Sequence, residues 1–168
     1  MKLLRHGPRG QERPGILDAE GVMRDLSGVL ADISGDTLAP GVLAKLASIN
    51  PAGLPAVPAG TRLGPPVTGM TNLVCIGLNY ADHAAELGVA PPKEPIVFLK
   101  SLGALSGPHD DIIIPPHSRK TDWECELCVV IGTTARHVTE AAAMDHVAGY
   151  CVGNDVSERE WQAERGGS

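Results

Sequence analysis

The segment TDWECEL, residues 121–127, carries three carboxylates at alternate positions directly before the apolar run CVVI. Residues at alternate positions of a β-strand point to the same face, so Asp122, Glu124 and Glu126 are predicted to form one row. Two ionised carboxylates about 5 Å apart repel by roughly 3 kcal/mol at an effective dielectric constant near 20. The fold must therefore place water or a positive charge beside this row.

Two environments satisfy this requirement. A solvated strand face is the common one for alternating acidic residues, but here the acidic face continues as Cys128 and Val130, which are core-type residues. The other is a divalent cation, because carboxylate oxygens suit Mg²⁺, Mn²⁺ or Ca²⁺ better than zinc. Asp155, in GYCVGNDVSER, is a candidate third ligand, although its spacing equally fits an Asp beside a helix cap at Ser157.

Short strands and short helices alternate without a repeating βαβ unit, which predicts a mixed α+β fold. Residues 1–70 form a small N-terminal α/β domain that ends in the Pro- and Gly-rich linker 51–69, and residues 71–168 form a second domain. Strands are expected in MKLLRHG, PGILDA, VMRDLSG, NLVCIGLNY, PIVFLK, DIIIP, CELCVVIG and YCVGNDV, and helices in TLAPGVLAKLASIN (capped by Thr37), YADHAAELG, EAAAMDHVAGY and the segment from Ser157.

Charge and apolar pattern exclude several classes of protein. A net charge of -6 without Lys/Arg clusters argues against nucleic-acid binding and against a polybasic membrane patch. No apolar run approaches the roughly 20 residues that span a bilayer, and the basic N-terminus breaks at Gly7-Pro8, so a cytoplasmic protein is predicted. Cys125 and Cys128 would point to opposite faces of a strand, which favours reduced thiols over a zinc site.

A second candidate site lies in NYADHAAELG. If residues 81–87 are helical, His83 and Glu86 are three residues apart and can touch. A carboxylate beside an imidazole raises its basicity, as is needed to take a proton from water. A solvated His–Glu pair on a helix surface is the commoner explanation of this spacing, so the pair alone leaves both readings open.

The motifs IGLNYADHAAE, EPIVFLK, TDWECELCVVIG and EAAAMDHVAGYCVGNDVSERE, in this order and at these separations, resemble the fumarylacetoacetate hydrolase (FAH) family. The resemblance covers about residues 73–165, and the region before it is similar to the one that precedes the catalytic domain in many bacterial members. It implies a mixed β-roll, usually in a homodimer, of which residues 71–168 would be the N-terminal part.

The resemblance also implies a set of site residues. The cation would be Mg²⁺ or Mn²⁺, with Ca²⁺ as a further option, and Asp122 would be a neighbour of the ligands. Carried over residue by residue, the metal ligands are Glu124, Glu126 and Asp155, the catalytic dyad is His83 and Glu86, and the substrate-binding positions are Lys100, Arg159 and Gln162.

The activity that the resemblance implies is hydrolysis of a C–C bond in a 2-oxo or 1,3-diketo acid such as an acylpyruvate. The cation would polarise the chelated carbonyl and stabilise the enolate, and the dyad would activate water. Lyase, decarboxylase and isomerase reactions of related members use the same enolate and stay open, as does an inactive binding or assembly module. Family members continue beyond this length, so a truncated chain is expected, weakly active by itself and prone to associate through strand edges.

Overall fold

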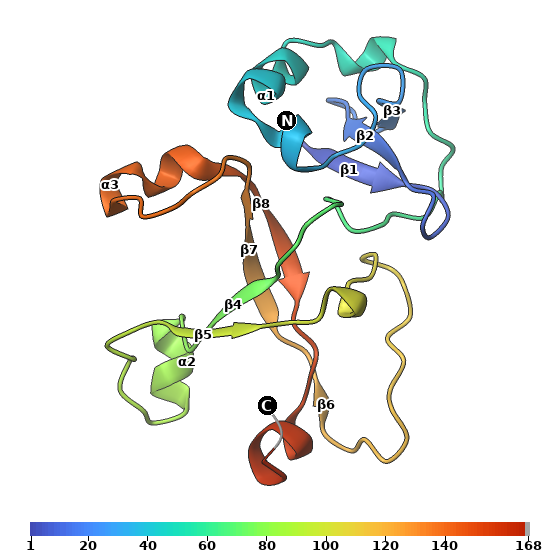
Figure 1. Cartoon of the computed structure of the whole chain (residues 1–168). Helices are drawn as coiled ribbons and strands as arrows, with labels where there is room; N and C mark the ends of the chain where they lie inside the picture. The colour runs from blue at the N-terminus through green and yellow to red at the C-terminus, as the bar shows by residue number, and fades with distance from the viewer. Residues whose placement is uncertain (167–168) are drawn as a thin grey trace. The chain divides into compact units, whose positions relative to one another are not determined.

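The computed structural model describes residues 1–166, which divide into two compact units (Figure 1). The first unit comprises Met1–Thr68 and the chain from Gly107 onward, and the second is Gly69–Ser106. Short strands and short helices occur in both, so the predicted mixed α+β fold is confirmed. The predicted boundary between residues 70 and 71 lies close to the start of the second unit. A division by compactness does not define a domain in the family sense, so the predicted domains 1–70 and 71–168 stay a prediction.

Most elements are short. The strands of the first unit are β1 (Leu3–His6), β2 (Arg13–Leu17), β3 (Met23–Asp25), β6 (Thr121–Asp122), β7 (Cys125–Ile131), β8 (Val147–Asn154) and β9 (Ser157–Glu158). Its helices are α1 (Pro40–Ala47) and α3 (Glu140–Ala143), with 3-10 turns at Gly35–Leu38, Pro51–Gly53 and Met144–His146 and a π-helical turn at Glu160–Glu164. The second unit contains β4 (Val74–Gly77), α2 (Ala81–Glu86), β5 (Ile96–Leu99) and a 3-10 turn at Leu102–Ala104.

The N-terminal part of the first unit is an antiparallel sheet in the order β1-β2-β3. Ile16 in β2, Leu26 just after β3 and Leu46 in α1 form a buried cluster. Partly buried side chains around it belong to Leu3, Leu30, Val42, Leu43, Ile49 and Leu54. The three predicted N-terminal strands and the predicted helix therefore share one small apolar core.

The cap predicted for this helix is wrong. Ala39 occupies the N-cap position of α1, and Pro40 stands at its first turn, where a missing N–H costs nothing. Thr37 belongs to the preceding 3-10 turn, and its hydroxyl donates to the carbonyl of Asp32 at 2.8 Å. Thr37 thus fixes the turn before the helix and does not begin the helix itself.

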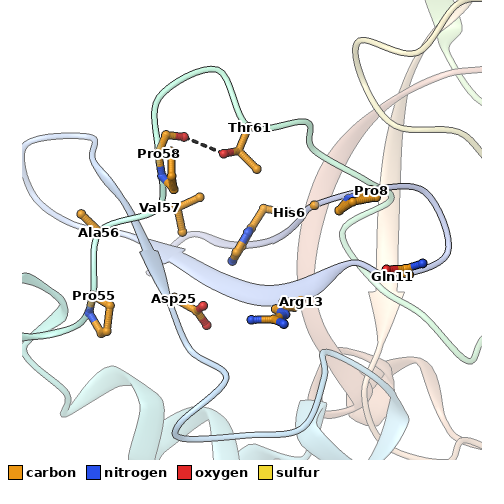
Figure 2. Close-up of a pocket in the computed structure, with 11 residues that line it drawn as sticks. His6, Pro8, Gln11, Arg13, Asp25, Pro55, Ala56, Val57, Pro58 and Thr61 are labelled. Atoms are coloured by element: carbon orange, nitrogen blue, oxygen red, sulfur yellow. Dashed lines mark hydrogen bonds between the residues drawn. The ribbon is translucent and has the colours of Figure 1, made fainter.

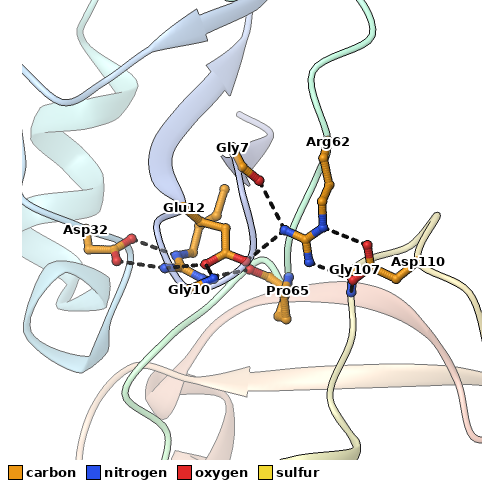
Figure 3. A network of polar contacts seen from close by, with 9 residues as sticks. Gly7, Gly10, Glu12, Asp32, Arg62, Pro65, Gly107 and Asp110 are labelled. Atoms are coloured by element: carbon orange, nitrogen blue, oxygen red, sulfur yellow. Dashed lines mark hydrogen bonds and ion pairs between the residues drawn. The ribbon is translucent and has the colours of Figure 1, made fainter.

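A network of buried charges joins β1 to the segments that follow the N-terminal sheet (Figure 3). Arg5 donates to both carboxylate oxygens of Asp32, at 2.7 and 2.9 Å. Arg62 donates to Glu12 at 2.8 Å and to both oxygens of Asp110 at 2.6 Å. Because bidentate arginine–carboxylate pairs hold both partners in a fixed geometry, this network fastens the loop around Asp110 to the N-terminal sheet.

The long two-stranded ladder of the first unit pairs β7 with β8 antiparallel. Its register places Glu126 opposite Gly153 and Cys128 opposite Cys151, with an irregularity between Val130 and Ile131. Side chains alternate along β7 between exposed and half-buried, and Glu126 lies on the half-buried face. Figure 1 shows the two strands running side by side.

Three predicted elements are corrected. The helix predicted for EAAAMDHVAGY ends in the turn Met144–His146, because residues 147–150 already belong to β8 and pair with β7. Residues 111–115, DIIIP, form no strand, and Ile113 is 87% exposed, because this segment has no partner strand within residues 1–166. Ser157 does not begin a helix, because it pairs in β9 with Asp122 of β6. A helical turn follows only at Glu160–Glu164.

Candidate functional site

The predicted metal ligands lie together on one face of the β7–β8 ladder. The amide of Asp155 donates to the carbonyl of Glu124 at 2.9 Å, and Glu126 is two residues further along, opposite Gly153. Two residues directly opposite each other in an antiparallel ladder lie on the same face, and so does the pair two positions along. Glu124 and Asp155 form one such pair and Glu126 belongs to the next, so all three side chains point the same way. All three are half-buried.

The state of Cys128 supports this placement. Burial raises the pKa of the Cys128 thiol, and Cys151, Glu126 and Asp155 add to the rise. These groups therefore lie close enough to the thiol to act on its charge. A Cβ on Gly153 would lie 2.6 Å from the sulfur of Cys128, so the thiol occupies the space beside this glycine on the face that carries Glu126.

The three carboxylates of the predicted row lie along one antiparallel pairing, which is interrupted only at residues 123–124 between β6 and β7. Asp122 belongs to β6 and pairs with β9, while Glu124 precedes β7. The backbone amide of Glu124 donates to the side-chain oxygen of Asn154 at 3.1 Å, which fixes the chain between the β6–β9 and β7–β8 ladders. The register does not change across this step, because Asp122 lies opposite Ser157 and Cys125 lies opposite Asn154 in the same antiparallel alignment. Arg159 contacts both Asp122 and Glu124.

Arg159 supplies the positive charge beside this cluster. Its guanidinium lies 2.5 Å from a carboxylate oxygen of Glu124 and donates to Asp122 at 3.1 Å. Burial lowers the pKa of Arg159, but its bonds to Asp122 and Glu124 outweigh this effect and raise it above the ordinary value. The same guanidinium donates to the side-chain oxygen of Gln162 at 3.2 Å, so the structure brings Arg159 and Gln162 together with two acidic residues.

The donor set and its backbone placement fit a hard divalent cation. Carboxylate oxygens from Glu124, Glu126 and Asp155 on one half-buried face are the ligand type that Mg²⁺ and Mn²⁺ prefer. In residues 1–166, however, no three His, Cys, Asp or Glu side chains converge as a metal site would need. The carboxylate of Glu124 is paired with Arg159.

In the second unit, α2 carries the predicted dyad. Nδ1 of His83 lies 3.7 Å from Oε2 of Glu86, one turn along, which confirms the expected i,i+3 proximity. The side chains of His83 and Glu86 are 48% and 79% exposed. Leu78, between β4 and α2, has a φ of 51°, a strained value for a bulky residue.

Lys100 directly follows β5 in the same unit. Its ammonium lies over the ring of Phe98, 5.9 Å from the ring centroid, and its amide donates to the carbonyl of Leu73 at 3.0 Å. The side chain is thus anchored beside a cation–π partner at the end of the β4–β5 ladder.

Sequence reasoning missed two residues that organise the acidic site. One is Asn154, described above, whose place immediately before Asp155 was the available signal. The other is Glu158, which accepts hydrogen bonds from the Ser118 hydroxyl and from the backbone amide of Lys120. Burial raises the pKa of Glu158, but these bonds lower it below the ordinary value. Glu158 thereby holds the β6–β9 corner that carries Arg159.

Comparison with known proteins identifies the class to which this fold belongs. Residues 72–168 match the family described as fumarylacetoacetate (FAA) hydrolase, C-terminal. A protein of Burkholderia ambifaria, named "Putative hydrolase", is 60% identical over 167 residues, which are 99% of this chain and 59% of that protein.

Solved structures agree with the family match. The fumarylacetoacetate hydrolase of Exiguobacterium antarcticum superposes with a TM-score of 0.77 at 32% identity, over 98% of this chain and 59% of that one. The 5-carboxymethyl-2-hydroxymuconate delta-isomerase of Mycobacterium smegmatis gives a TM-score of 0.69 at 28% identity, over 99% and 58%.

The chain therefore belongs to the fumarylacetoacetate hydrolase family, and the predicted resemblance and FAH-type fold are confirmed. It spans 59% of the length of the curated relatives that it matches. Among residues 1–166, no helix has both the length and the apolar character to cross a membrane.

Proposed function

We propose that the protein is a Mg²⁺- or Mn²⁺-dependent hydrolase that cleaves a C–C bond in a 2-oxo or 1,3-diketo acid of the acylpyruvate type. One observation carries the proposal: Glu124, Glu126 and Asp155 share a half-buried face of the β7–β8 ladder. Three carboxylates on one half-buried face favour a positive counter-charge, and a divalent cation supplies two such charges at once.

The residues divide the work by their chemistry. Glu124, Glu126 and Asp155 would hold the cation, which supplies a Lewis acid for the carbonyl oxygen of the substrate. Arg159 carries a planar guanidinium suited to a carboxylate, and Gln162 beside it adds an amide. His83, oriented by Glu86, would take a proton from water. Lys100 would add a further positive charge for the acidic substrate.

A second candidate is an isomerase, lyase or decarboxylase on the same scaffold. This second candidate is supported by the likeness to a delta-isomerase of Mycobacterium smegmatis. That likeness covers nearly the same share of the chain as the likeness to a hydrolase. Hydrolysis needs an activated water, whereas isomerisation and decarboxylation do not. Loss of His83 would therefore abolish the first activity and hurt the others much less.

Metal binding can be tested apart from turnover. Titration of the protein with Mn²⁺, followed by the electron paramagnetic resonance signal of the free ion, should give saturable binding. Glu126→Gln removes one charged ligand and should weaken binding at least about tenfold. Glu140→Gln, at the exposed start of α3, is the matched control and should leave binding unchanged. Equal affinity of the Glu126 variant and the wild type would sink the proposed site.

Turnover is tested with acylpyruvates and oxaloacetate in the presence of Mg²⁺, with pyruvate release as the readout. The proposal predicts hydrolysis of acylpyruvates, and oxaloacetate decarboxylation without acylpyruvate cleavage would favour the second candidate. Substrate-analogue binding by oxalate with Mg²⁺ but without turnover of any acid would instead indicate a binding module. We also propose that the protein is cytoplasmic and forms a homodimer. Analytical ultracentrifugation tests the dimer.

A further inference from the structure

A pocket of about 420 Å³ lies at the end of β1, where Arg13 and Asp25 face the chain from Pro55 to Thr61 (Figure 2). The guanidinium of Arg13 and the carboxylate of Asp25 lie close enough to act on each other, so these two opposite charges of the lining offset one another. Covalent chemistry that neither this pocket nor the proposed hydrolase site uses is found on the β7–β8 ladder, where two cysteines face each other.

Cys128 in β7 and Cys151 in β8 lie directly opposite each other in the antiparallel register. Facing residues in such a ladder alternate between hydrogen-bonded and non-hydrogen-bonded pairs. The amide of Asp155 donates to the carbonyl of Glu124, so these two residues form a pair of the hydrogen-bonded kind. The two cysteines stand an even number of positions further along the same register and are therefore a pair of the same kind, with Cα atoms about 5.5 Å apart.

This backbone separation fits a disulfide, whose Cα atoms most often lie about 5.5–6 Å apart. The Cβ atoms of facing strand residues are about 4.5–5.5 Å apart, whereas a disulfide needs about 3.5–4.5 Å. The strands would therefore have to approach each other by up to about 1 Å at this pair. A disulfide formed here is strained, and a strained disulfide is easier to reduce.

The two thiols are positioned to meet. Both cysteines are half-buried and are not joined in a disulfide in the structure. Burial is the largest cause that raises the pKa of the Cys128 thiol, and a hydrogen bond with the Cys151 thiol is a further cause. Gly153 is the next residue of β8 on this face, and the Cys128 sulfur occupies the space that its missing side chain leaves.

The other two cysteines do not share this position. Cys125 is an odd number of positions from Cys128 on the same strand, so its side chain points to the opposite face of the ladder, and it lies opposite Asn154. Cys75 belongs to β4 in the second unit. The fold therefore selects one pairing among four cysteines, and Cys125 is a matched control for it.

We propose that a peroxide converts Cys128 and Cys151 into a reversible disulfide that cross-links β7 to β8. One thiol attacks an oxygen of hydrogen peroxide, the O–O bond breaks, and a sulfenic acid and one water form. The second thiol attacks the sulfur of the sulfenic acid, the S–O bond breaks, and the S–S bond forms as a second water leaves. The two thiols lose two electrons in total, and the peroxide takes up these electrons and both thiol protons.

The cross-link lies beside the proposed metal ligands but does not depend on them. Glu126 and Gly153 form the next pair on the same face of the ladder. Because formation of the disulfide needs neither the cation nor His83, the proposal goes beyond the hydrolase activity and can be tested without it. A thiol such as glutathione reopens the bond by attack on one of its two sulfur atoms.

Peptide mapping of the reduced protein, treated with hydrogen peroxide in the presence of EDTA, tests the proposal. Remaining thiols are blocked with iodoacetamide before digestion, and mass spectrometry without a reducing agent identifies the linked peptides. The main linkage should join Cys128 to Cys151 within one chain. Reduced glutathione should reopen it in the native protein, because the bond is strained. In urea, the main linkage should shift to Cys125 and Cys128, because near neighbours meet most readily in an unfolded chain.

Variants locate the pairing. Cys125→Ser removes the thiol of the opposite face and should give the same linkage as the wild type. Cys151→Ser should give no linkage in the ladder, and its Cys128 should proceed to sulfinic acid. The map of the native wild type decides the proposal by itself if that variant fails to fold. The proposal fails if peroxide converts Cys128 and Cys151 to sulfinic acids without linking them, if both stay reduced while Cys125 is oxidised, if the main disulfide contains Cys75 or Cys125, or if the Cys128–Cys151 bond resists glutathione.

Discussion

The guanidinium of Arg159 lies 2.5 Å from the carboxylate of Glu124, so one proposed substrate-binding residue forms an ion pair with one proposed metal ligand. Both side chains are about one quarter to one third exposed. An ion pair of this kind contributes roughly 0–1 kcal/mol. A cation that recruits Glu124 has to compete with Arg159 for the same oxygens.

Removal of Arg159 should therefore strengthen metal binding. In Arg159→Gln, we expect the dissociation constant for Mn²⁺ to fall about two- to fivefold, because the lost ion pair contributes at most about 1 kcal/mol. The Michaelis constant for an acylpyruvate should rise at the same time, because the guanidinium no longer receives the substrate carboxylate. Calorimetry with Mn²⁺ and steady-state kinetics measure the two effects.

Arg136→Gln is the control for this change, because it removes the same charge from an exposed position elsewhere in the same unit. It should alter neither constant by more than about twofold. Weaker Mn²⁺ binding by the Arg159 variant would contradict the competition between arginine and cation.

His83 should separate metal binding from hydrolysis. His83→Ala removes the proposed base but none of the carboxylates of β7–β8, so Mn²⁺ affinity should stay within about twofold of the wild type. Hydrolysis should fall by about 10²–10⁴, the usual contribution of general base catalysis. His109→Ala, an exposed histidine of the other unit, is the matched control. Near-normal hydrolysis by the His83 variant would remove the dyad from the mechanism.

The sequence predicted which carboxylates share a strand face better than it predicted what those carboxylates contact. Alternation placed Glu124 and Glu126 on one face, and the half-buried pattern of β7 agrees with this. Alternation alone could not show that the strand is interrupted between Asp122 and Cys125, because long-range pairing decides where a ladder breaks. The ion pair with Arg159 was missed for the same reason.

The local apolar pattern predicted an element correctly where another segment of the chain was available to pair with it or pack against it. The run CELCVVIG forms β7 because it pairs with β8. The segment DIIIP has an equally strong β-pattern but forms no strand. Thr37 was a chemically reasonable cap, but Pro40 determined where α1 begins.

Gly107 should be intolerant of any side chain. A Cβ at this position would lie 2.0 Å from the carbonyl oxygen of Leu63, a backbone atom that cannot move aside alone. Gly107→Ala should cost about 1–3 kcal/mol of unfolding free energy, as overpacking does. For a chain of this size, that lowers the melting temperature by roughly 2–12 °C. Differential scanning calorimetry measures the change.

Gly28→Ala is the control, because a Cβ at Gly28 meets no atom within 4 Å. Its melting temperature should stay within about 2 °C of the wild type. If the Gly107 variant were as stable as the Gly28 variant, the backbone around Leu63 would move aside at little cost in free energy. That result would contradict a backbone held in place by the arginine network.

Asp110 should make stability depend on pH in the acid range. The hydrogen bonds from Arg62, with that from the Gly107 amide, lower the pKa of Asp110 from 3.8 to about 2. Because the folded-state pKa lies below the ordinary value, its stabilising contribution is complete above pH 3.8 and is lost as the pH falls toward 2. Asp110→Asn should therefore be less stable than the wild type at neutral pH, and this difference should shrink across that window.

Urea unfolding at a series of pH values measures the difference in unfolding free energy between this variant and the wild type. Asp111→Asn, at the exposed neighbouring position, should show a difference near zero throughout. A constant gap between the Asp110 variant and the wild type down to pH 2 would mean that the Arg62 pair contributes through its shape and not through the charge of Asp110.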